Sequence, residues 1–210
     1  MLSVLTFDIG RDIDVGAVAS VMAGGDTVYA SADHLYVASQ RWIDWTAMFD
    51  PREASEEAET VTTHIHRFDI GDPGGAVYQG SGSVDGFLLN QFAMSEHDGF
   101  LRVASTDRPA WGWWDDERRS ESRVDVLALE GDELRIVGSV GGLGRDERIF
   151  AVRFIGDIGY VVTFRETDPL YTIDLSDPTA PEVVGELKIL GYSAYLHPIG
   201  DGLLLSLIHI

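Results

Sequence analysis

The sequence contains no cysteine, one lysine (Lys188) and one asparagine (Asn90). Without cysteine, disulfide bonds, thiolate metal sites and cysteine nucleophiles are all excluded. No apolar run approaches the roughly 18 residues of a membrane-spanning helix, so we expect no membrane span in this chain. The first eight residues, Met1 to Asp8, have no basic segment ahead of an apolar stretch, so they do not form a signal peptide.

Positive charge is also scarce, because 15 Lys and Arg stand against 35 Asp and Glu, for a formal net charge of −20. Nucleic acids and anionic lipids bind proteins mainly through Lys and Arg that neutralise phosphate groups. We therefore expect no nucleic-acid partner. The hydrophobic share of 45% is enough for a substantial core, and 210 residues fit one large all-β domain or two small domains.

The clearest structural pattern lies between Ile149 and Ile189, where short apolar runs alternate with turn signals. The runs are Phe150–Phe154, Tyr160–Phe164, Leu170–Leu175 and Val183–Ile189, and the breaks read GDIG (156–159), TDP (167–169) and SDP (176–178). Glycine allows positive φ, aspartate hydrogen-bonds to its own backbone, and proline fixes the φ of a turn. The stretch therefore predicts a four-stranded antiparallel meander, the size of one β-propeller blade.

The rest of the chain aligns to this unit, and the tetrapeptide Phe-Asp-Ile-Gly recurs at 7–10 and 68–71. Four-stranded units repeated in this way are typical of an all-β β-propeller, in which blades are arranged around a channel. The alignment predicts a single propeller region over 1–210. It consists of a partial blade over 1–24, whole blades over about 27–84, 90–141 and 149–190, and a partial blade over 194–210.

The chain begins and ends within blades, which predicts an incomplete fragment of a larger propeller. The apolar run from Leu203 to Ile210 would otherwise leave an unpaired strand at a sheet edge, which natural domains avoid. In the alternative, the two terminal half-blades combine into one fourth blade and the chain closes on itself.

Several segments together resemble a family of prokaryotic secreted proteins whose C-terminal β-propeller is distantly related to WD repeats. The resemblance is strongest over 86–201. It rests on LNQFAM (89–94), DGFLRVA (98–104), RFIGD (153–157), GYVVTF (159–164), TDPLY (167–171), DLSDP (174–178), GELKI (185–189) and YLHP (195–198). The resemblance implies a propeller fold and an extracellular or cell-surface location. The activity of the family is not established, so it implies no catalytic residue.

All five tryptophans lie in two insertions between the second and third strands of successive blades: Trp42, Trp45, Trp111, Trp113 and Trp114. In a propeller these loops emerge on the same face as the connections between blades. Aromatic side chains grouped on loops over a rigid scaffold are typical of recognition surfaces. We therefore predict a ligand-binding face there, for a protein or carbohydrate ligand at the cell surface. In the alternative, each tryptophan folds back to fill its own loop.

Metal and cofactor signals are weak, and we expect no cofactor. His64 and His66 share one face of a strand but have no evident third ligand. Calcium at an acidic loop is the one metal alternative, with carboxylates such as Asp8, Asp12 and Asp14. Turn chemistry explains Asp174, Asp177 and Asp201 equally well.

Catalytic signatures are absent as well, since the sequence has neither a glycine-flanked serine elbow nor a phosphate-binding loop. His197, before Pro198, is expected to be a structural hydrogen-bonding residue on an inner strand. The sequence thus favours a non-enzymatic binding or scaffold module. The alternative is a carbohydrate-active hydrolase or lyase with paired carboxylates at the channel mouth, and a third interpretation is a structural piece of a surface layer.

Overall fold

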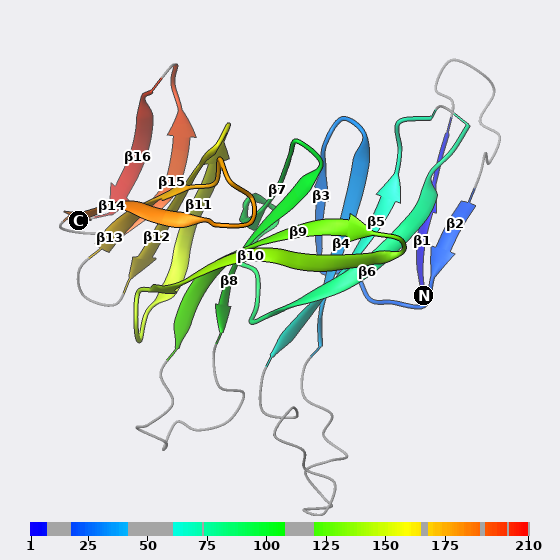
Figure 1. The fold of residues 1–210 in the computed structure, drawn as a ribbon, viewed down its shortest axis with the longest axis horizontal. Helices are drawn as coiled ribbons and strands as arrows, with labels where there is room; N and C mark the ends of the chain where they lie inside the picture. Colours follow the sequence, from blue (N-terminus) through cyan, green and yellow to red (C-terminus); the bar gives the residue numbers. More distant parts are fainter. Residues whose placement is uncertain are drawn as a thin grey trace, which may run out of the picture.

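A computed structural model describes residues 1–7, 18–41, 61–72, 74–107, 120–164, 168–189, 192–200 and 202–209. Every regular element in these ranges is a β-strand apart from one short 3₁₀ helix. Three successive four-stranded antiparallel units follow one another across the molecule (Figure 1). This arrangement confirms the predicted all-β architecture built from propeller blades.

The first and second blades each run from a short inner strand to a long outer strand. The first blade comprises β3 (Thr27–Ala30), β4 (His34–Arg41), β5 (Thr62–Asp69) and β6 (Val77–Asp85). The second comprises β7 (Met94–His97), β8 (Phe100–Asp107), β9 (Glu121–Glu130) and β10 (Glu133–Leu143), preceded by the 3₁₀ helix η3 (Gln91–Ala93). Parallel pairing of Ser81 with Glu133 and Gly82 with Leu134 joins β6 to β10, so the two blades form one eight-stranded sheet.

The third blade is a separate sheet, with a two-stranded sheet at each end of the molecule (Figure 1). It comprises β11 (Arg148–Ile155), β12 (Ile158–Phe164), β13 (Asp168–Asp174) and β14 (Glu182–Ile189). The two-stranded sheets are β1 (Leu2–Leu5) with β2 (Val18–Val21), and β15 (Tyr192–Pro198) with β16 (Leu204–His209). These two pairs do not combine into one blade, so the alternative of a fourth blade built from the terminal half-blades is wrong for this structure.

Three stretches depart from the predicted blades. The first whole blade, predicted over about 27–84, extends to Asp85, because the β5–β6 ladder continues to the pair Thr62–Asp85. The second, predicted over about 90–141, is likewise strand as far as Leu143, which pairs with Ser122. The second blade, predicted to begin at about residue 90, starts with η3 before its first strand, because the Asn90 side chain accepts a hydrogen bond from the Phe92 N–H at 2.9 Å and holds a helical turn.

The core runs continuously through the three blades, and the second and third strands supply most of it. Six consecutive residues of β8, Leu101 to Thr106, are buried, because neighbouring blades cover both faces of this strand. Tyr36, Leu127 and Ile173, one from each blade, belong to the same cluster and are fully buried. A smaller cluster of Ala151, Val162 and Leu196 joins the third blade to β15.

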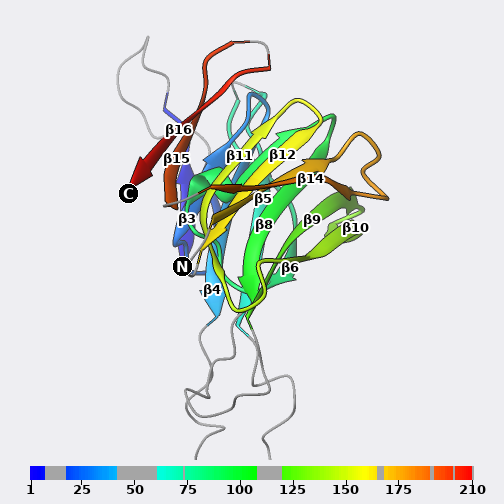
Figure 2. The same ribbon diagram turned by 90° about the vertical axis from the view of Figure 1, so that its left-hand side faces the viewer.

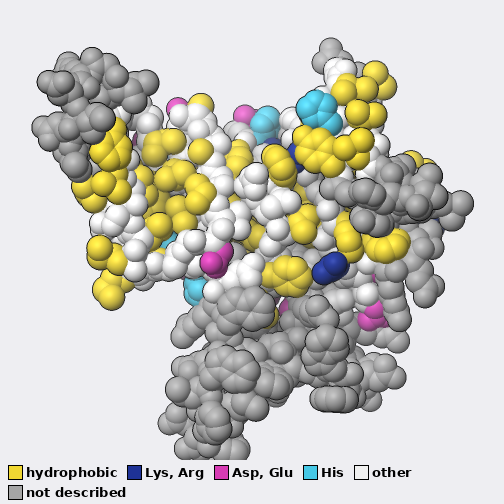
Figure 3. Space-filling model, turned by 180° about the vertical axis from the view of Figure 1, so that it is seen from behind, with side chains coloured by type: hydrophobic (Ala, Val, Ile, Leu, Met, Phe, Trp, Pro, Cys, Tyr) yellow, Lys and Arg dark blue, Asp and Glu magenta, His cyan; other side chains and the backbone are white. Residues whose placement is uncertain are grey.

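The first strands of the blades gather on one side, which we call the inner face. Figure 2 shows β3 and β15 on one side of the molecule and β10 and β14 on the other. Viewed from the inner side, the described residues show several hydrophobic patches and few charged side chains (Figure 3). Among the described residues, no helix is long or apolar enough to cross a membrane.

One buried carboxylate, Asp125 on β9, gives a pH-dependent prediction. Burial raises the pKa of Asp125, although the Ser139 hydroxyl donates a hydrogen bond to Oδ1 at 2.6 Å and partly opposes the shift. The other oxygen, Oδ2, is buried with no hydrogen-bond partner in the described part of the chain. The carboxyl of Asp125 therefore has a higher pKa in the native state than in the unfolded state. As a result, the free energy of unfolding decreases as the pH rises from the unfolded-state pKa through the native-state pKa.

We therefore expect Asp125→Asn to stabilise the protein at pH 8 by about 1 kcal/mol, the scale of one unpartnered buried polar group. The gain should shrink towards pH 4, because the wild-type carboxyl takes up its proton as the pH falls through its raised pKa. Urea unfolding at both pH values measures the difference. Asp174→Asn is the control of opposite sign, because the Ser176 N–H lowers the pKa of Asp174. An Asp125→Asn effect that is the same at both pH values would contradict this account.

Candidate functional site

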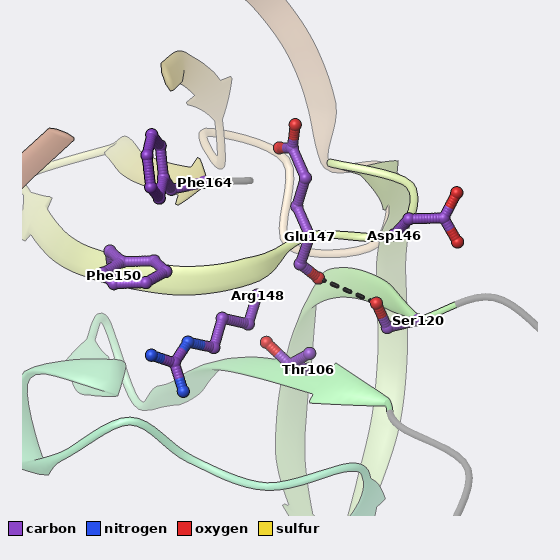
Figure 4. Close-up of a pocket in the computed structure, with 7 residues that line it drawn as sticks. All are labelled: Thr106, Ser120, Asp146, Glu147, Arg148, Phe150 and Phe164. Carbon is purple, nitrogen blue, oxygen red and sulfur yellow. Dashed lines mark hydrogen bonds between the residues drawn. The ribbon is translucent and has the colours of Figure 1, made fainter. Parts of the chain in front are cut away.

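The strand ends that carry the two long insertions lie on one edge of the molecule, which we call the insertion face. The ends of β4 and β8 and the beginnings of β5 and β9 all point to this edge (Figure 1). A cavity of about 370 Å³ opens here between the second and third blades. Seven residues line it (Figure 4): Thr106, Ser120, Asp146, Glu147, Arg148, Phe150 and Phe164.

Backbone hydrogen bonds hold the wall of this cavity, because the connection between β10 and β11 is fastened to the beginning of β9. The Ser120 hydroxyl donates to the Glu147 carbonyl at 3.1 Å (Figure 4), and the Asp146 N–H donates to the Ser120 carbonyl at 2.9 Å. Thr106 closes the inner end, where its hydroxyl accepts a hydrogen bond from the Ile149 N–H at 3.1 Å. The cavity therefore has a fixed wall on both blades.

A tight turn at Gly144 sets the direction of the residues that follow. Gly144 has a φ of 60°, and a Cβ there would lie 2.6 Å from Glu147 Oε2 and 2.6 Å from Thr163 Cβ. Its N–H donates to the Tyr171 hydroxyl at 3.2 Å, and the Thr163 hydroxyl donates to the Glu147 carboxylate. Only glycine combines this conformation with such close neighbours, so the turn positions Glu147 and Arg148 beside the cavity.

The cavity offers both aromatic and hydrogen-bonding surface. Arg148 Cζ lies 4.6 Å from the ring centroid of Phe150, and the rings of Phe150 and Phe164 meet edge to face with centroids 5.5 Å apart. Ring surfaces with a few convergent polar groups, in a volume of about 300–1,000 Å³, are typical of small-ligand sites. The two carboxylates of the lining diverge, since Asp146 points away from Glu147 (Figure 4).

A second polar cluster lies at the opposite edge, between the first and second blades. Glu96 accepts hydrogen bonds from the Ser31 hydroxyl at 2.5 Å and from His34 Nδ1 at 2.7 Å, while Arg67 Nη2 lies 2.7 Å from His34 Nε2. Serine, histidine and glutamate also make up hydrolase triads, but there the serine hydrogen-bonds to the histidine. Here Ser31 binds the carboxylate and Arg67 occupies the free imidazole nitrogen, so the cluster joins blades and has no activated nucleophile.

The five tryptophans predicted to bind ligand lie outside the described residues: Trp42, Trp45, Trp111, Trp113 and Trp114. Their role stays a prediction. The residues that flank their segments are described, and Thr106 and Ser120, on either side of the second segment, both line the cavity.

No group of three or more potential metal ligands occurs among the described residues. His64 and His66 are half-buried on β5, and burial followed by the proximity of His64 lowers the pKa of His66. Asp174 and Asp177 accept hydrogen bonds from the N–H groups of Ser176 and Thr179, both at 2.9 Å, as expected for turn residues. The other calcium candidates fall outside the described ranges: Asp8, Asp12, Asp14 and Asp201.

Sequence patterns did not single out the residues that line the cavity. Phe150 and Phe164 occur in ordinary strand runs, at the beginning of β11 and the end of β12. Arg148 is one of 15 basic residues and carries no motif. The only local signal is the glycine-rich stretch at 141–144, which predicts a tight turn but does not indicate a ligand.

Comparison with known proteins places the chain within a described family. The family model of the β-propeller domain matches residues 1–207. An uncharacterised protein of Methanocaldococcus jannaschii is 51% identical over 127 residues, which cover 60% of this chain and 19% of that protein. An uncharacterised protein of Archaeoglobus fulgidus is 42% identical over 166 residues, which cover 79% of this chain and 23% of that protein. The matched region thus spans about one fifth of these relatives.

Proposed function

Because the chain belongs to the β-propeller domain family, we propose that it is a non-enzymatic binding module that recognises its ligand at the insertion face. The observation that carries this proposal is the cavity of about 370 Å³ between the second and third blades. Propellers commonly use the loops on one face of a rigid scaffold for recognition. This cavity lies on that face and has fixed walls from two blades.

The lining favours a carbohydrate of one or two rings. Phe150 and Phe164 offer apolar ring surface for the C–H face of a sugar, while Arg148, Ser120 and Thr106 offer groups that hydrogen-bond to hydroxyls. The tryptophans are the second part of the proposal. We propose that Trp111, Trp113 and Trp114 extend the binding surface, since the segment that carries them joins two residues of the cavity wall.

Isothermal titration calorimetry and tryptophan fluorescence with glucose, galactose, mannose, N-acetylglucosamine and their disaccharides test this function. We expect one of these sugars to bind and to change the fluorescence. Arg148→Ala should weaken that binding about tenfold or more, the scale of one charged hydrogen bond. Arg135→Ala, on the exposed outer strand β10, is the matched control and should leave binding unchanged.

Two outcomes would overturn the proposal. If no sugar binds, or if Arg148→Ala and Arg135→Ala bind alike, the cavity is not a carbohydrate site and a protein partner takes precedence. If incubation with the bound sugar releases a product, the module is an enzyme. Glu147→Gln would then be the first variant to assay, because glycosidases act through carboxylates.

We also propose that the protein functions at the cell surface, as the family resemblance implies. Support comes from the acidic surface, which disfavours nucleic-acid partners. Cleavage of the native protein by protease added to intact cells checks the location, and complete protection would contradict it.

A further inference from the structure

Arg153 stands out on the inner face because aromatic side chains from neighbouring elements surround it. Its Cζ lies 3.4 Å from the ring centroid of Phe92 on η3 and 4.8 Å from that of Tyr195 on β15. The two rings meet edge to face, with centroids 6.4 Å apart. Elements of the second blade, the third blade and the β15–β16 pair therefore converge on one guanidinium group.

The donors of this guanidinium are largely available. Arg153 Nη1 donates to the Val152 carbonyl at 3.3 Å, and within the described ranges no carboxylate lies at ion-pair distance. A guanidinium carries five N–H donors in a planar fork. By contrast, the buried Arg102 binds the Gly156 carbonyl and the Ser95 hydroxyl at 2.5 and 2.8 Å. Arg153 is thus less fully satisfied than the arginine that fastens the neighbouring blades.

The surrounding charge favours an anion, although the whole chain is strongly acidic. Neither β11 nor β15 contains an aspartate or glutamate, and η3 has none. The view of the inner face accordingly shows few acidic atoms (Figure 3). An anion that reaches Arg153 meets a positive group without a competing carboxylate on these three elements.

A small cavity of about 50 Å³ adjoins the guanidinium, with Asn90, Phe92, Arg153 and Tyr195 in its lining. A liquid water occupies about 30 Å³, so the cavity has room for one carboxylate group. The Asn90 oxygen accepts a hydrogen bond from the Phe92 N–H at 2.9 Å, and this bond fixes the orientation of the amide whose NH₂ group can donate to a ligand. His197 is exposed, and its ring stacks on that of Tyr195 with centroids 6.0 Å apart.

We propose that Arg153, with Asn90 and the rings of Phe92 and Tyr195, binds the carboxylate group of a small organic ligand on the inner face. The planar guanidinium fork matches a carboxylate in a two-bond geometry that a lysine cannot reproduce. The exposed edges of Phe92 and Tyr195 offer apolar surface to the rest of the ligand. Among the described residues, this cavity shares Phe150 with the cavity on the insertion face, but Arg153, Asn90, Phe92 and Tyr195 line only the smaller one. The proposal therefore does not depend on the function proposed for the insertion face.

Titration of the ¹⁵N-arginine-labelled protein with sodium acetate and with sodium galacturonate, each against sodium chloride, tests the proposal by NMR. We expect the Arg153 side-chain Nε–H signal to shift saturably with a carboxylate and to stay unchanged with chloride. If both carboxylates bind with equal affinity, the site recognises the carboxylate group alone. Tighter binding of galacturonate shows that the site also recognises the sugar ring. Arg153→Lys removes the Arg153 signal, so its binding is measured by isothermal titration calorimetry beside the wild type, and it should be at least tenfold weaker.

Arg153 also packs between blades, so each variant needs a folding check by cooperative urea unfolding. Tyr195→Phe keeps the ring and the packing, and should preserve binding within about threefold. Arg148→Lys, in the other cavity, should have no effect on carboxylate binding, which separates this proposal from the carbohydrate site. An Arg153 signal that does not shift, or binding that survives Arg153→Lys unchanged, would overturn the assignment.

Discussion

Replacement of Glu96 by alanine is expected to lower the free energy of unfolding by about 3–5 kcal/mol, the scale for removal of one member of a buried charged cluster. Glu96 reaches from β7 of the second blade to Ser31 and His34 of the first, and only 9% of its side chain is exposed. Its loss leaves the Ser31 hydroxyl and the imidazole without their acceptor. Blade-to-blade contact at this edge then weakens.

The hydrogen-bond directions explain why the effect is large. Arg67 Nη2 can only donate, so His34 Nε2 accepts and His34 Nδ1 carries the proton that it donates to Glu96. Glu96 is the negatively charged end of the hydrogen-bonded series Arg67–His34–Glu96, so its removal leaves the buried Arg67 without that charge. Glutamine keeps one acceptor oxygen, so Glu96→Gln should cost about half as much as Glu96→Ala.

Urea unfolding monitored by circular dichroism measures these changes. Glu133→Ala is the control, because Glu133 pairs with Arg135 on the surface and both side chains are more than half exposed. Such surface pairs contribute about 0–1 kcal/mol. A Glu96→Ala effect no larger than that of Glu133→Ala would show that the cluster does not hold the blades together.

Local chemistry is the reason that the blades were predictable from the sequence. The turn between β11 and β12 uses Gly156 at a φ of 53°, and the turn after β13 uses hydrogen bonds to the Asp174 side chain. These signals act within a few residues, so the local sequence alone is enough to predict the turns. Runs such as Tyr160–Phe164 correspond to strands because neighbouring blades bury both of their faces.

Strand lengths and contacts between blades were less predictable, because they depend on partners far away in the sequence. The extension of β6 to Asp85 reflects pairing with Thr62, and glycine and serine in that stretch gave no strand signal. Glu96 and His34 are 62 residues apart, and neither belongs to a motif. A solvated acid and a buried one look alike in a chain with 35 acids.

The candidate site shows the same division. Recognition at the loops on one face of the propeller stays a prediction, and the cavity between the second and third blades lies at the strand ends that carry these loops. The residues of its wall were not predictable, because Phe150 and Phe164 meet only when β11 and β12 pair. The tryptophans that the sequence singled out remain an untested part of the proposal.

Replacement of Gly138 by alanine is expected to cost about 2–3 kcal/mol through overpacking between the second and third blades. A Cβ at Gly138 would lie 2.8 Å from Pro181 Cδ and 2.9 Å from the Thr179 carbonyl carbon, and closer still to the Pro178 carbonyl oxygen. The turn at 178–181, with which this Cβ would clash, is rigid. Two prolines stiffen it, and the Asp177 side chain accepts a hydrogen bond from the Thr179 N–H at 2.9 Å.

Gly185 on β14 is the matched control, because IVG at 136–138 and VVG at 183–185 occupy the outer strands of successive blades. A Cβ there would meet only Thr172 Cβ at 3.5 Å, an ordinary contact, and neither glycine has a positive φ. Gly185→Ala should therefore be neutral or stabilising by up to about 1 kcal/mol, since alanine restricts the unfolded chain. Urea midpoints of the two variants measure the contrast. Equal midpoints would mean that the outer strand of the second blade does not pack against the turn of the third as closely as the structure shows.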